Sequence, residues 1–403
     1  MTDIDLTHHE HRAGEHPSEH LAPALPLAAV AGLRGKSTVV WLVNSMLQSA
    51  GRAVALWSST GVYVNGERQE GELGPWGRAL EALQAGQLDV AVQELETSTV
   101  TSVGLPQRIY PVAAVTTLCG NNEDCLISPE AAQGARAVAM LARAVRPDGD
   151  LVLNADDTAV RAAADLTAAR VILYALHPEN PALRKHLEKG GCGVWADDGR
   201  IVLGTRLDQR GVIAIDDAHF TLSGALTFQV QNLLCAVAIA AALQVPDEAI
   251  RQAVSAFEPD PNRLPGSCNI IRLPGATLVI DGAHQVWTLR SLVRGIRHQP
   301  HRRMVTVSGC FPHLSEPQLI EAGRLLGRLG GAVILHAPPG QRRMVDAMIE
   351  GISQNDIPPL VLSMPSEHEA IVHALRMIRE GDFGLVVTGD AQSAAETIWS
   401  IEG

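Results

Sequence analysis

The segment VAGLRGKSTVVW, residues 30–41, combines residue types that bind phosphate. Those residues are Gly32, Gly35, Lys36, Ser37 and Thr38. The glycines allow the backbone to approach an anion, and the N–H groups that open a helix face it. The lysine can reach the β- and γ-phosphates of a nucleotide, and either hydroxyl can bind Mg²⁺. The alternative is a glycine-capped turn, because Val30 stands where a full phosphate loop has its first glycine.

Lysine is rare in this chain, so a lysine in the glycine turn is not expected by chance. The lysines are Lys36, Lys185 and Lys189, and all other basic residues are arginines. Lys185 and Lys189 lie in a polar helical segment, so we expect them to be solvated.

Acidic residues follow several of the predicted strands. Glu96 ends the strand DVAVQELE, Asp156 and Asp157 follow LVLNA, and Asp281 ends a later strand with His284 shortly after it. A single acid at a strand end is usually a helix cap. Several such acids at the edge that carries a phosphate loop favour a magnesium nucleotide instead.

Short apolar runs alternate with helical segments along most of the chain, which predicts parallel βαβ units and an α/β fold. Three prolines and a glycine interrupt this series at FEPDPNRLPGS, and a second alternating series follows. We therefore predict domains at residues 23–262 and 263–403. Residues 1–22 carry five histidines without helical or strand periodicity, so a disordered tail is expected, with a metal-binding tract as the alternative.

Composition excludes several classes of protein. Lys and Arg number 32 against 44 Asp and Glu, and the net charge of −12 argues against a nucleic-acid partner. The chain has no run of eighteen apolar residues and no apolar leader, so we expect a soluble cytoplasmic protein without a membrane partner. Six scattered cysteines lack a CxxC pair, which predicts free thiols rather than disulfides or a zinc site. We also expect a homo-oligomer.

Several longer phrases resemble the Mur ligase family, and within it the C-terminal half of cyanophycin synthetases. They are GVYVNGERQEG…GPW (61–76), AVRPDGDLVLNADDTAV (144–160), HPENPALRKHLEKGG (177–191) and FEPDPNRLPGSCN (257–269). The loop GLRGKS is also similar to the GTRGKS form of poly-γ-glutamate synthases, which explains the missing first glycine. The similarity covers residues 27–310 well and fades afterwards.

This resemblance implies a Mur ligase central domain with a phosphate loop and a mostly parallel sheet, followed by a Rossmann-like C-terminal domain. It implies an ATP- and Mg²⁺-dependent ligase that phosphorylates an amino-acid or peptide carboxylate and lets an amine attack the acyl phosphate. In cyanophycin synthetases this half adds arginine to the aspartate side chain of a growing peptide. The ATP-grasp half of those enzymes is absent from this sequence, so a standalone Mur-like half is expected.

The resemblance also implies roles for individual residues. Lys36 would bind the phosphates, and Ser37 with Glu96 would hold magnesium. Asn232 would lie beside the adenine. Asp281 and His284 would close on the nucleotide from the second domain.

The departures from the family pattern cluster at the site. Cys125 stands where the family has a magnesium-binding histidine, and Phe228 alters the pair before the adenine asparagine. Ser267 replaces an arginine, for which Arg263 is a candidate substitute. Two hypotheses follow: an active ligase, or a catalytically degenerate relative that serves as a binding or scaffold partner of a complete cyanophycin synthetase.

Overall fold

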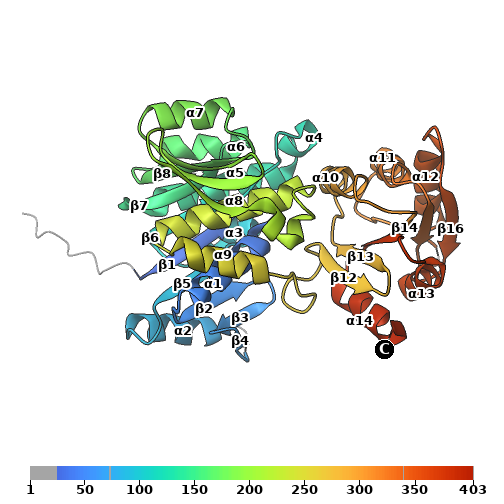
Figure 1. Cartoon of the computed structure of the whole chain (residues 1–403), viewed down its shortest axis with the longest axis horizontal. Coiled ribbons are helices and arrows are strands. Elements are labelled where there is room, and N and C mark those ends of the chain that lie inside the picture. Colours follow the sequence, from blue (N-terminus) through green and yellow to red (C-terminus); the bar gives the residue numbers. More distant parts are fainter. Residues whose placement is uncertain (1–24, 72–73, 339, 403) are drawn as a thin grey trace, which may run out of the picture.

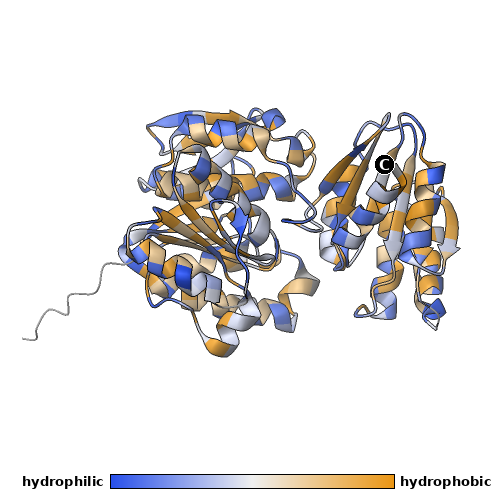
Figure 2. Cartoon of the chain, turned by 90° about the horizontal axis from the view of Figure 1, so that it is seen from below, coloured by the Kyte–Doolittle hydropathy of each residue, from blue (hydrophilic) through white to orange (hydrophobic). Residues whose placement is uncertain are grey.

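The computed structural model describes residues 25–71, 74–338 and 340–402, so the predicted tail at residues 1–22 lies outside the described residues. The chain forms two bodies, each built on its own sheet, which appear at the two sides of Figure 1. Helices cover both faces of each sheet, and the apolar residues lie mainly between helices and strands (Figure 2). This confirms the α/β fold predicted from the alternating pattern.

The first sheet has eleven strands in the order β11-β10-β9-β8-β7-β6-β1-β5-β2-β3-β4. Strands β1, β5, β6 and β7 are parallel neighbours, so their carboxyl ends share one edge, as the sequence predicts. The two ends of the sheet, β9 to β11 and β2 to β4, are antiparallel. The strands are β1 (Leu27–Ala31), β2 (Val54–Ser58), β3 (Gly61–Val64), β4 (Glu67–Arg68), β5 (Val90–Glu94), β6 (Tyr110–Val115), β7 (Val145–Asn154), β8 (Arg170–Ala175), β9 (Cys192–Asp197), β10 (Arg200–Gly204) and β11 (Gln209–Ala214).

The helices of the first body divide between the two faces of this sheet. One face packs against α1 (Lys36–Ser49), α8 (Thr227–Ala242) and α9 (Asp247–Ala256). The other face packs against α2 (Gly74–Gln84), α3 (Thr97–Val103), α5 (Pro129–Ala144), α6 (Thr158–Arg161) and α7 (Pro181–Glu188). Shorter elements are α4 (Glu123–Leu126), η1 (Ala162–Leu166), η2 (Ile215–Asp217) and η3 (His219–Thr221).

The second sheet has six strands in the order β12-β13-β17-β14-β15-β16, and all pairs except β12 with β13 are parallel. Helices α10 (Val286–Ile296), α11 (Glu316–Gly327) and α12 (Arg342–Ser353) pack on one face. Helices α13 (Glu367–Met377) and α14 (Ala391–Glu402) pack on the other. The strands are β12 (Asn269–Leu273), β13 (Ala276–Asp281), β14 (Met304–Gly309), β15 (Ala332–His336), β16 (Leu360–Met364) and β17 (Phe383–Val387).

The segment that connects the two bodies runs from the end of α9 at Ala256 to the start of β12 at Asn269. The predicted boundary at residue 262 falls within this segment and stays a prediction. In the described residues, no helix is both long enough and apolar enough to span a membrane.

Candidate functional site

The glycine loop after β1 has a backbone that requires its glycines. Gly32 and Gly35 have φ angles of 139° and 90°, a region that side chains rarely adopt. A Cβ atom at Gly32 would overlap the Thr116 hydroxyl, and one at Gly35 would overlap the Asn232 side chain. The Leu33 N–H donates to the carbonyl of Thr117 over 2.7 Å, which ties the loop to the end of β6. The loop is therefore fixed in a tight turn at the start of α1.

Helix α1 begins at Lys36 directly after this turn, with Gly35 as its N-cap residue. Glycine offers no side chain to cap the first N–H groups, so these groups are available to an anion. The Lys36 side chain is largely buried, and its Nζ lies 3.2 Å from Oε2 of Glu96. Thr38 is buried within the helix. The predicted lysine and the predicted acid are thus in contact.

A second carboxylate, Glu94 at the end of β5, binds the loop serine. Ser37 Oγ donates to Glu94 Oε1 over 2.9 Å, and the Ser59 N–H donates to Oε2 over 3.0 Å. Burial raises the pKa of Glu94 above its ordinary value, although Lys36 and the Ser37 hydrogen bond act in the opposite direction.

The resemblance to the Mur ligases pairs Ser37 with Glu96 and gives no role to Glu94. The structure places Glu94 beside Ser37 and places Glu96 against Lys36 instead. The signal that could have found it is in QELE, where two acids stand two residues apart at the end of the strand. Glu94 is the last residue of β5, and the Glu96 side chain is 57% exposed just beyond it.

Oxygen donors suit a magnesium ion at this position. The Ser37 hydroxyl and the Glu94 carboxylate lie within 2.9 Å of each other, and Mg²⁺ usually takes one or two protein oxygens, the phosphates of the substrate and water. In residues 25–71, 74–338 and 340–402, no cluster of three or more His, Cys, Asp or Glu residues is placed to hold a metal. The donor set therefore fits a single ion shared with a phosphate.

Asn232, predicted beside an adenine, lies on α8 against Gly35. Its Nδ2 donates to Gln229 Oε1 over 2.9 Å, and Gln229 in turn donates to the carbonyl of Ser267 over 3.1 Å. These contacts connect the glycine loop to the segment between the two sheets. The predicted contact of Asn232 with a base stays a prediction.

Asp281, at the end of β13 in the second sheet, reaches the glycine loop. Its carboxylate lies 3.7 Å from Nη2 of Arg34 and accepts a hydrogen bond from the Cys268 thiol over 2.9 Å. Arg34 also donates to the carbonyl of Thr288 over 3.2 Å and lies 4.0 Å from the centre of the Phe228 ring. Burial raises the pKa of Asp281, and Arg34 acts against this rise.

Two further predicted residues lie at the edges of this region. His284 is exposed, with Nδ1 donating to the carbonyl of Gly282, and its ring packs edge-to-face on His313. Arg263 is exposed, with its guanidinium 5.5 Å from the Trp41 ring, and lines a cavity of about 440 Å³ between α1, α9 and the connecting segment. A role for either residue at a phosphate stays a prediction.

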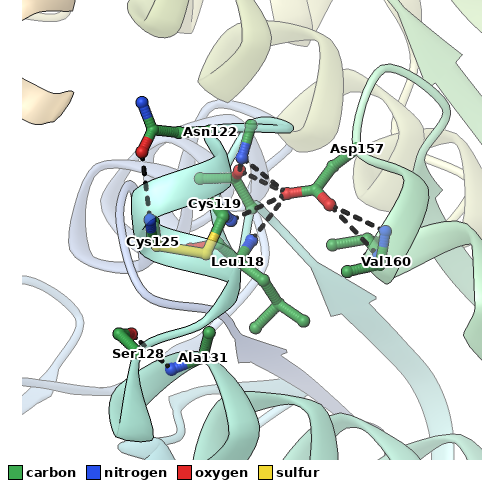
Figure 3. Close-up of a disulfide and its surroundings, with 11 residues drawn as sticks. Leu118, Cys119, Asn122, Cys125, Ser128, Ala131, Asp157 and Val160 are labelled. Atoms are coloured by element: carbon green, nitrogen blue, oxygen red, sulfur yellow. Dashed lines mark hydrogen bonds between the residues drawn. A yellow bond between two sulfur atoms is a disulfide. The ribbon is translucent and has the colours of Figure 1, made fainter.

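The strand-end acids after β7 are structural. Asp157 is fully buried and caps α6 through the N–H groups of Ala159 and Val160. Its other oxygen accepts four hydrogen bonds from the loop at residues 117–120 (Figure 3). Asp156 accepts hydrogen bonds from Leu176, Asn180 and Gln231. The observed contacts are those of helix-capping and loop-fixing carboxylates, and magnesium binding by these two acids stays a prediction.

The cysteine prediction was also partly wrong. Cys119 and Cys125 form a disulfide, with Cα atoms 5.6 Å apart (Figure 3). The other four cysteines are free, at positions 192, 235, 268 and 310. Spacing alone gave no signal for the pair, because five residues separate its members and the turn that brings them together is set by Asp157.

No family model matches the chain. Among curated proteins, the cyanophycin synthetase of Synechocystis sp. is 25% identical over 93% of the chain, and that of Crocosphaera subtropica is 27% identical over 90%. The match spans 43% and 42% of these two relatives, less than half of their length. The UDP-N-acetylmuramoyl-L-alanyl-D-glutamate--2,6-diaminopimelate ligase of Thermosynechococcus vestitus is 25% identical over 93% of the chain and 72% of its own length. The homologues of this chain are cyanophycin synthetases and Mur ligases.

Solved structures show the same fold. E. coli FolC in complex with ADP superposes with a TM-score of 0.64 at 18% identity, over 94% of this chain and 90% of FolC. MurF from Acinetobacter baumannii gives a TM-score of 0.63 at 16% identity, over 93% and 76%. These neighbours carry both α/β domains, so the Mur ligase fold predicted from the sequence phrases is confirmed.

Proposed function

We propose that this Mur ligase homologue is an ATP-dependent carboxylate–amine ligase. The observation that carries the proposal is the glycine loop at the start of α1. In it, Lys36 forms an ion pair with Glu96, and Ser37 donates a hydrogen bond to Glu94. A nucleotide phosphate would displace Glu96 from the lysine. Ser37 and Glu94 would hold Mg²⁺, which would neutralise charge on the phosphates.

The reaction would proceed in two steps. A carboxylate oxygen of the acid substrate attacks the γ-phosphorus of ATP, and ADP leaves. The neutral amine nitrogen then attacks the acyl carbon, the bond from that carbon to the phosphate oxygen breaks, and the nitrogen loses a proton, which gives the amide and hydrogen phosphate. This chain would contribute the positioning of the phosphates by Lys36 and the loop N–H groups. Contact of the second body with the loop through Arg34 and Asp281 would help exclude water from the acyl phosphate.

The substrate we propose is an amino-acid or peptide carboxylate, with an aspartate and arginine polymer as the first candidate because of the cyanophycin synthetase homologues. The test is ADP release with Mg-ATP, a cyanophycin-like peptide and either arginine or lysine. Turnover above the peptide-free control is expected, and it should be lost in Lys36→Ala but kept in Lys185→Ala, whose side chain is exposed.

The second candidate is a degenerate relative that binds a complete cyanophycin synthetase. Cys125 favours it, because its sulfur is held in a disulfide and a magnesium-binding histidine is expected at that position. Co-purification with such a synthetase, together with no ADP release by the isolated chain, would support this candidate and contradict the first. The cytoplasmic location and the homo-oligomer also stay predictions.

A further inference from the structure

The Cys119–Cys125 disulfide lies in the segment after β6, next to the glycine loop. Cys119 and Cys125 are both buried, and Figure 3 shows the bond between their sulfur atoms. The bond joins two parts of this segment that differ in their hydrogen bonds to the rest of the protein. One part is the turn at residues 117–120, and the other is the short helix α4.

The turn at residues 117–120 is firmly anchored. Asp157 Oδ2 accepts the N–H groups of Leu118, Cys119 and Gly120 over 2.9 to 3.0 Å, and it also accepts the Thr117 hydroxyl. The carbonyl of Thr117 accepts the Leu33 N–H of the glycine loop. The backbone of Cys119 is therefore fixed relative to the proposed nucleotide site, whatever the state of its sulfur.

The described backbone hydrogen bonds of Cys125 in helix α4, by contrast, are local. The Cys125 N–H donates to Oδ1 of Asn122, and its carbonyl accepts the Ser128 N–H. Leu126 and Ile127, which follow, are 43% and 86% exposed. The disulfide is thus the covalent tie between α4 and the anchored turn. The other described contacts between them are weaker: the Cys125 sulfur lies 3.7 Å from the Leu118 carbonyl, and the Asn122 N–H donates to the Cys119 carbonyl over 3.0 Å. We therefore expect α4 to be the part that moves more when the covalent tie breaks.

The second body packs on this tie. Trp287, in the first turn of α10, and Leu33 of the glycine loop both contact the cluster formed by Cys119, Cys125 and Ala131. The next residue of α10, Thr288, accepts the hydrogen bond from Arg34. Movement of α4 would therefore change the surface on which α10 meets the glycine loop.

We propose that Cys119 and Cys125 are a redox-controlled positioning pair. The disulfide holds α4 against the anchored turn, so that Trp287 and Leu33 pack on a rigid cluster. Reduction by a low-molecular-weight thiol releases α4 and loosens the contact between the two bodies. Nucleotide binding is then weaker in the reduced protein, a consequence that rests on the proposed function.

The exchange is balanced with an external thiol as the reductant. One external thiolate attacks a sulfur of the disulfide, forms a mixed disulfide and expels the other cysteine as a thiolate, which takes up a proton. A second external thiolate attacks the external sulfur of the mixed disulfide and releases the first cysteine. In sum, two external thiols become one external disulfide, and the protein gains two thiols. An external disulfide such as oxidised glutathione drives the reverse reaction.

The test compares the full chain after treatment with oxidised glutathione and after treatment with a reducing phosphine. Mass spectrometry of peptides first establishes the Cys119–Cys125 bond in the oxidised sample. Hydrogen exchange is then expected to rise on reduction in α4 and in the first turn of α10, but not in the turn anchored by Asp157. The dissociation constant for Mg-ADP, measured by calorimetry, is expected to rise by about fivefold or more, as for coupled sites.

Matched variants separate this pair from the other cysteines. Cys119→Ser with Cys125→Ser should behave like the reduced protein under both treatments, and Cys192→Ser with Cys310→Ser should keep the full redox response. Equal exchange in α4 and α10 in both redox states would overturn the proposal, and so would a peptide map without the bond. If Mg-ADP binds neither form while exchange in α4 and α10 still responds, the positioning pair stands and the proposed function fails. If Mg-ADP binds both forms equally, the coupling to nucleotide is overturned.

Discussion

Glu94 shows how one half-buried carboxylate influences the electrostatics of the candidate site. It receives hydrogen bonds from Ser37 and Ser59 and lies close to Lys36, yet burial is the largest influence on its pKa and raises it. The protonated form is thus populated at a higher pH than for an exposed glutamate. A magnesium ligand must be ionised, so this carboxyl would control metal binding over that range of pH.

We predict that Mg-dependent nucleotide affinity rises with pH as Glu94 ionises through its raised pKa. Glu94→Gln should lower the affinity at neutral pH by about tenfold or more and remove this pH dependence. The stability of the unliganded protein should change in the opposite sense, because a group with a raised folded pKa loses its stabilising contribution as pH rises through that pKa. Calorimetric titrations with Mg-ADP between pH 4.5 and pH 8, roughly the range in which carboxyl groups with raised pKa values ionise, measure the first effect.

The control for this prediction is Glu67→Gln, which changes an exposed glutamate on β4. Its pH profile should match that of the wild type. An unchanged profile in Glu94→Gln would instead assign the ionisation to another group.

Asp157 is the residue on which the turn at residues 117–120 depends. Burial alone would raise its pKa, but the hydrogen bonds from Gly120, Thr117 and their neighbours lower it overall. Asp157→Asn would put an amide donor among N–H donors, so we predict a loss of about 2–4 kcal/mol in the free energy of unfolding. Since its folded pKa is lowered, this stabilisation is present above the unfolded pKa and lost as pH falls through the folded pKa.

Urea unfolding at several pH values measures this effect. Asp165→Asn, at an exposed position of η1, is the matched control and should stay within about 0.5 kcal/mol of the wild type. A variant at Asp157 as stable as this control would show that the six hydrogen bonds contribute nothing net.

At the scale of elements, the glycine loop depends on the packing of α1 against α8. Gly35 has a positive φ angle, and the Asn232 side chain fills the space where a Cβ would stand. Gly35→Ala should therefore destabilise the protein by at least about 1 kcal/mol and displace Asn232 from the loop. Mg-ADP affinity should fall with it. Gly77→Ala, in an open helical position of α2, is the control and should be neutral or slightly stabilising.

The parts of the chain in which strands alternate with helices could be predicted from the sequence. In the second series, the apolar runs TLVIDGAH, MVTVSGC, AVILHA, LVLSM and GLVVTGD predict strands, and β13 to β17 overlap these five runs. The antiparallel strands β9 to β11 and β12 were not predicted, because they are joined to the next strand by turns without a helix between them and so lack the strand–helix alternation.

Within the site, Lys36, Ser37 and the loop glycines could be found from spacing alone. The choice between Glu94 and Glu96 could not, because it depends on where β5 ends relative to Ser37. The ion pair between Arg34 and Asp281 could not be predicted either, since it joins residues from different sheets. Contacts of this kind are set by how the two bodies pack and leave no local pattern.

At the scale of the whole molecule, the two bodies meet beside the glycine loop. Arg34 contacts Asp281 and the Thr288 carbonyl of the second body, and stacks over Phe228 of the first. Trp287, also in the second body, packs on the cluster that contains the disulfide. The loop that would hold the phosphates is therefore also a point of contact between the bodies, so nucleotide binding and the arrangement of the bodies should depend on each other.

We predict that Arg34→Ala loosens this contact. The largely buried Asp281 would lose its ion pair, and Phe228 its stacked cation, so the second body should move more freely about the connecting segment. Small-angle X-ray scattering should show a larger radius of gyration without nucleotide than in the wild type. Arg272→Ala, at an exposed position of β12, should leave the scattering unchanged.

Because Arg34 and Asp281 act on each other, adding Asp281→Asn to Arg34→Ala should increase the radius of gyration less than the sum of the single changes. Additive changes would mean that the two residues hold the bodies together independently, and an unchanged radius in Arg34→Ala would place the main contact elsewhere, with the packing of Trp287 as the next contact to test.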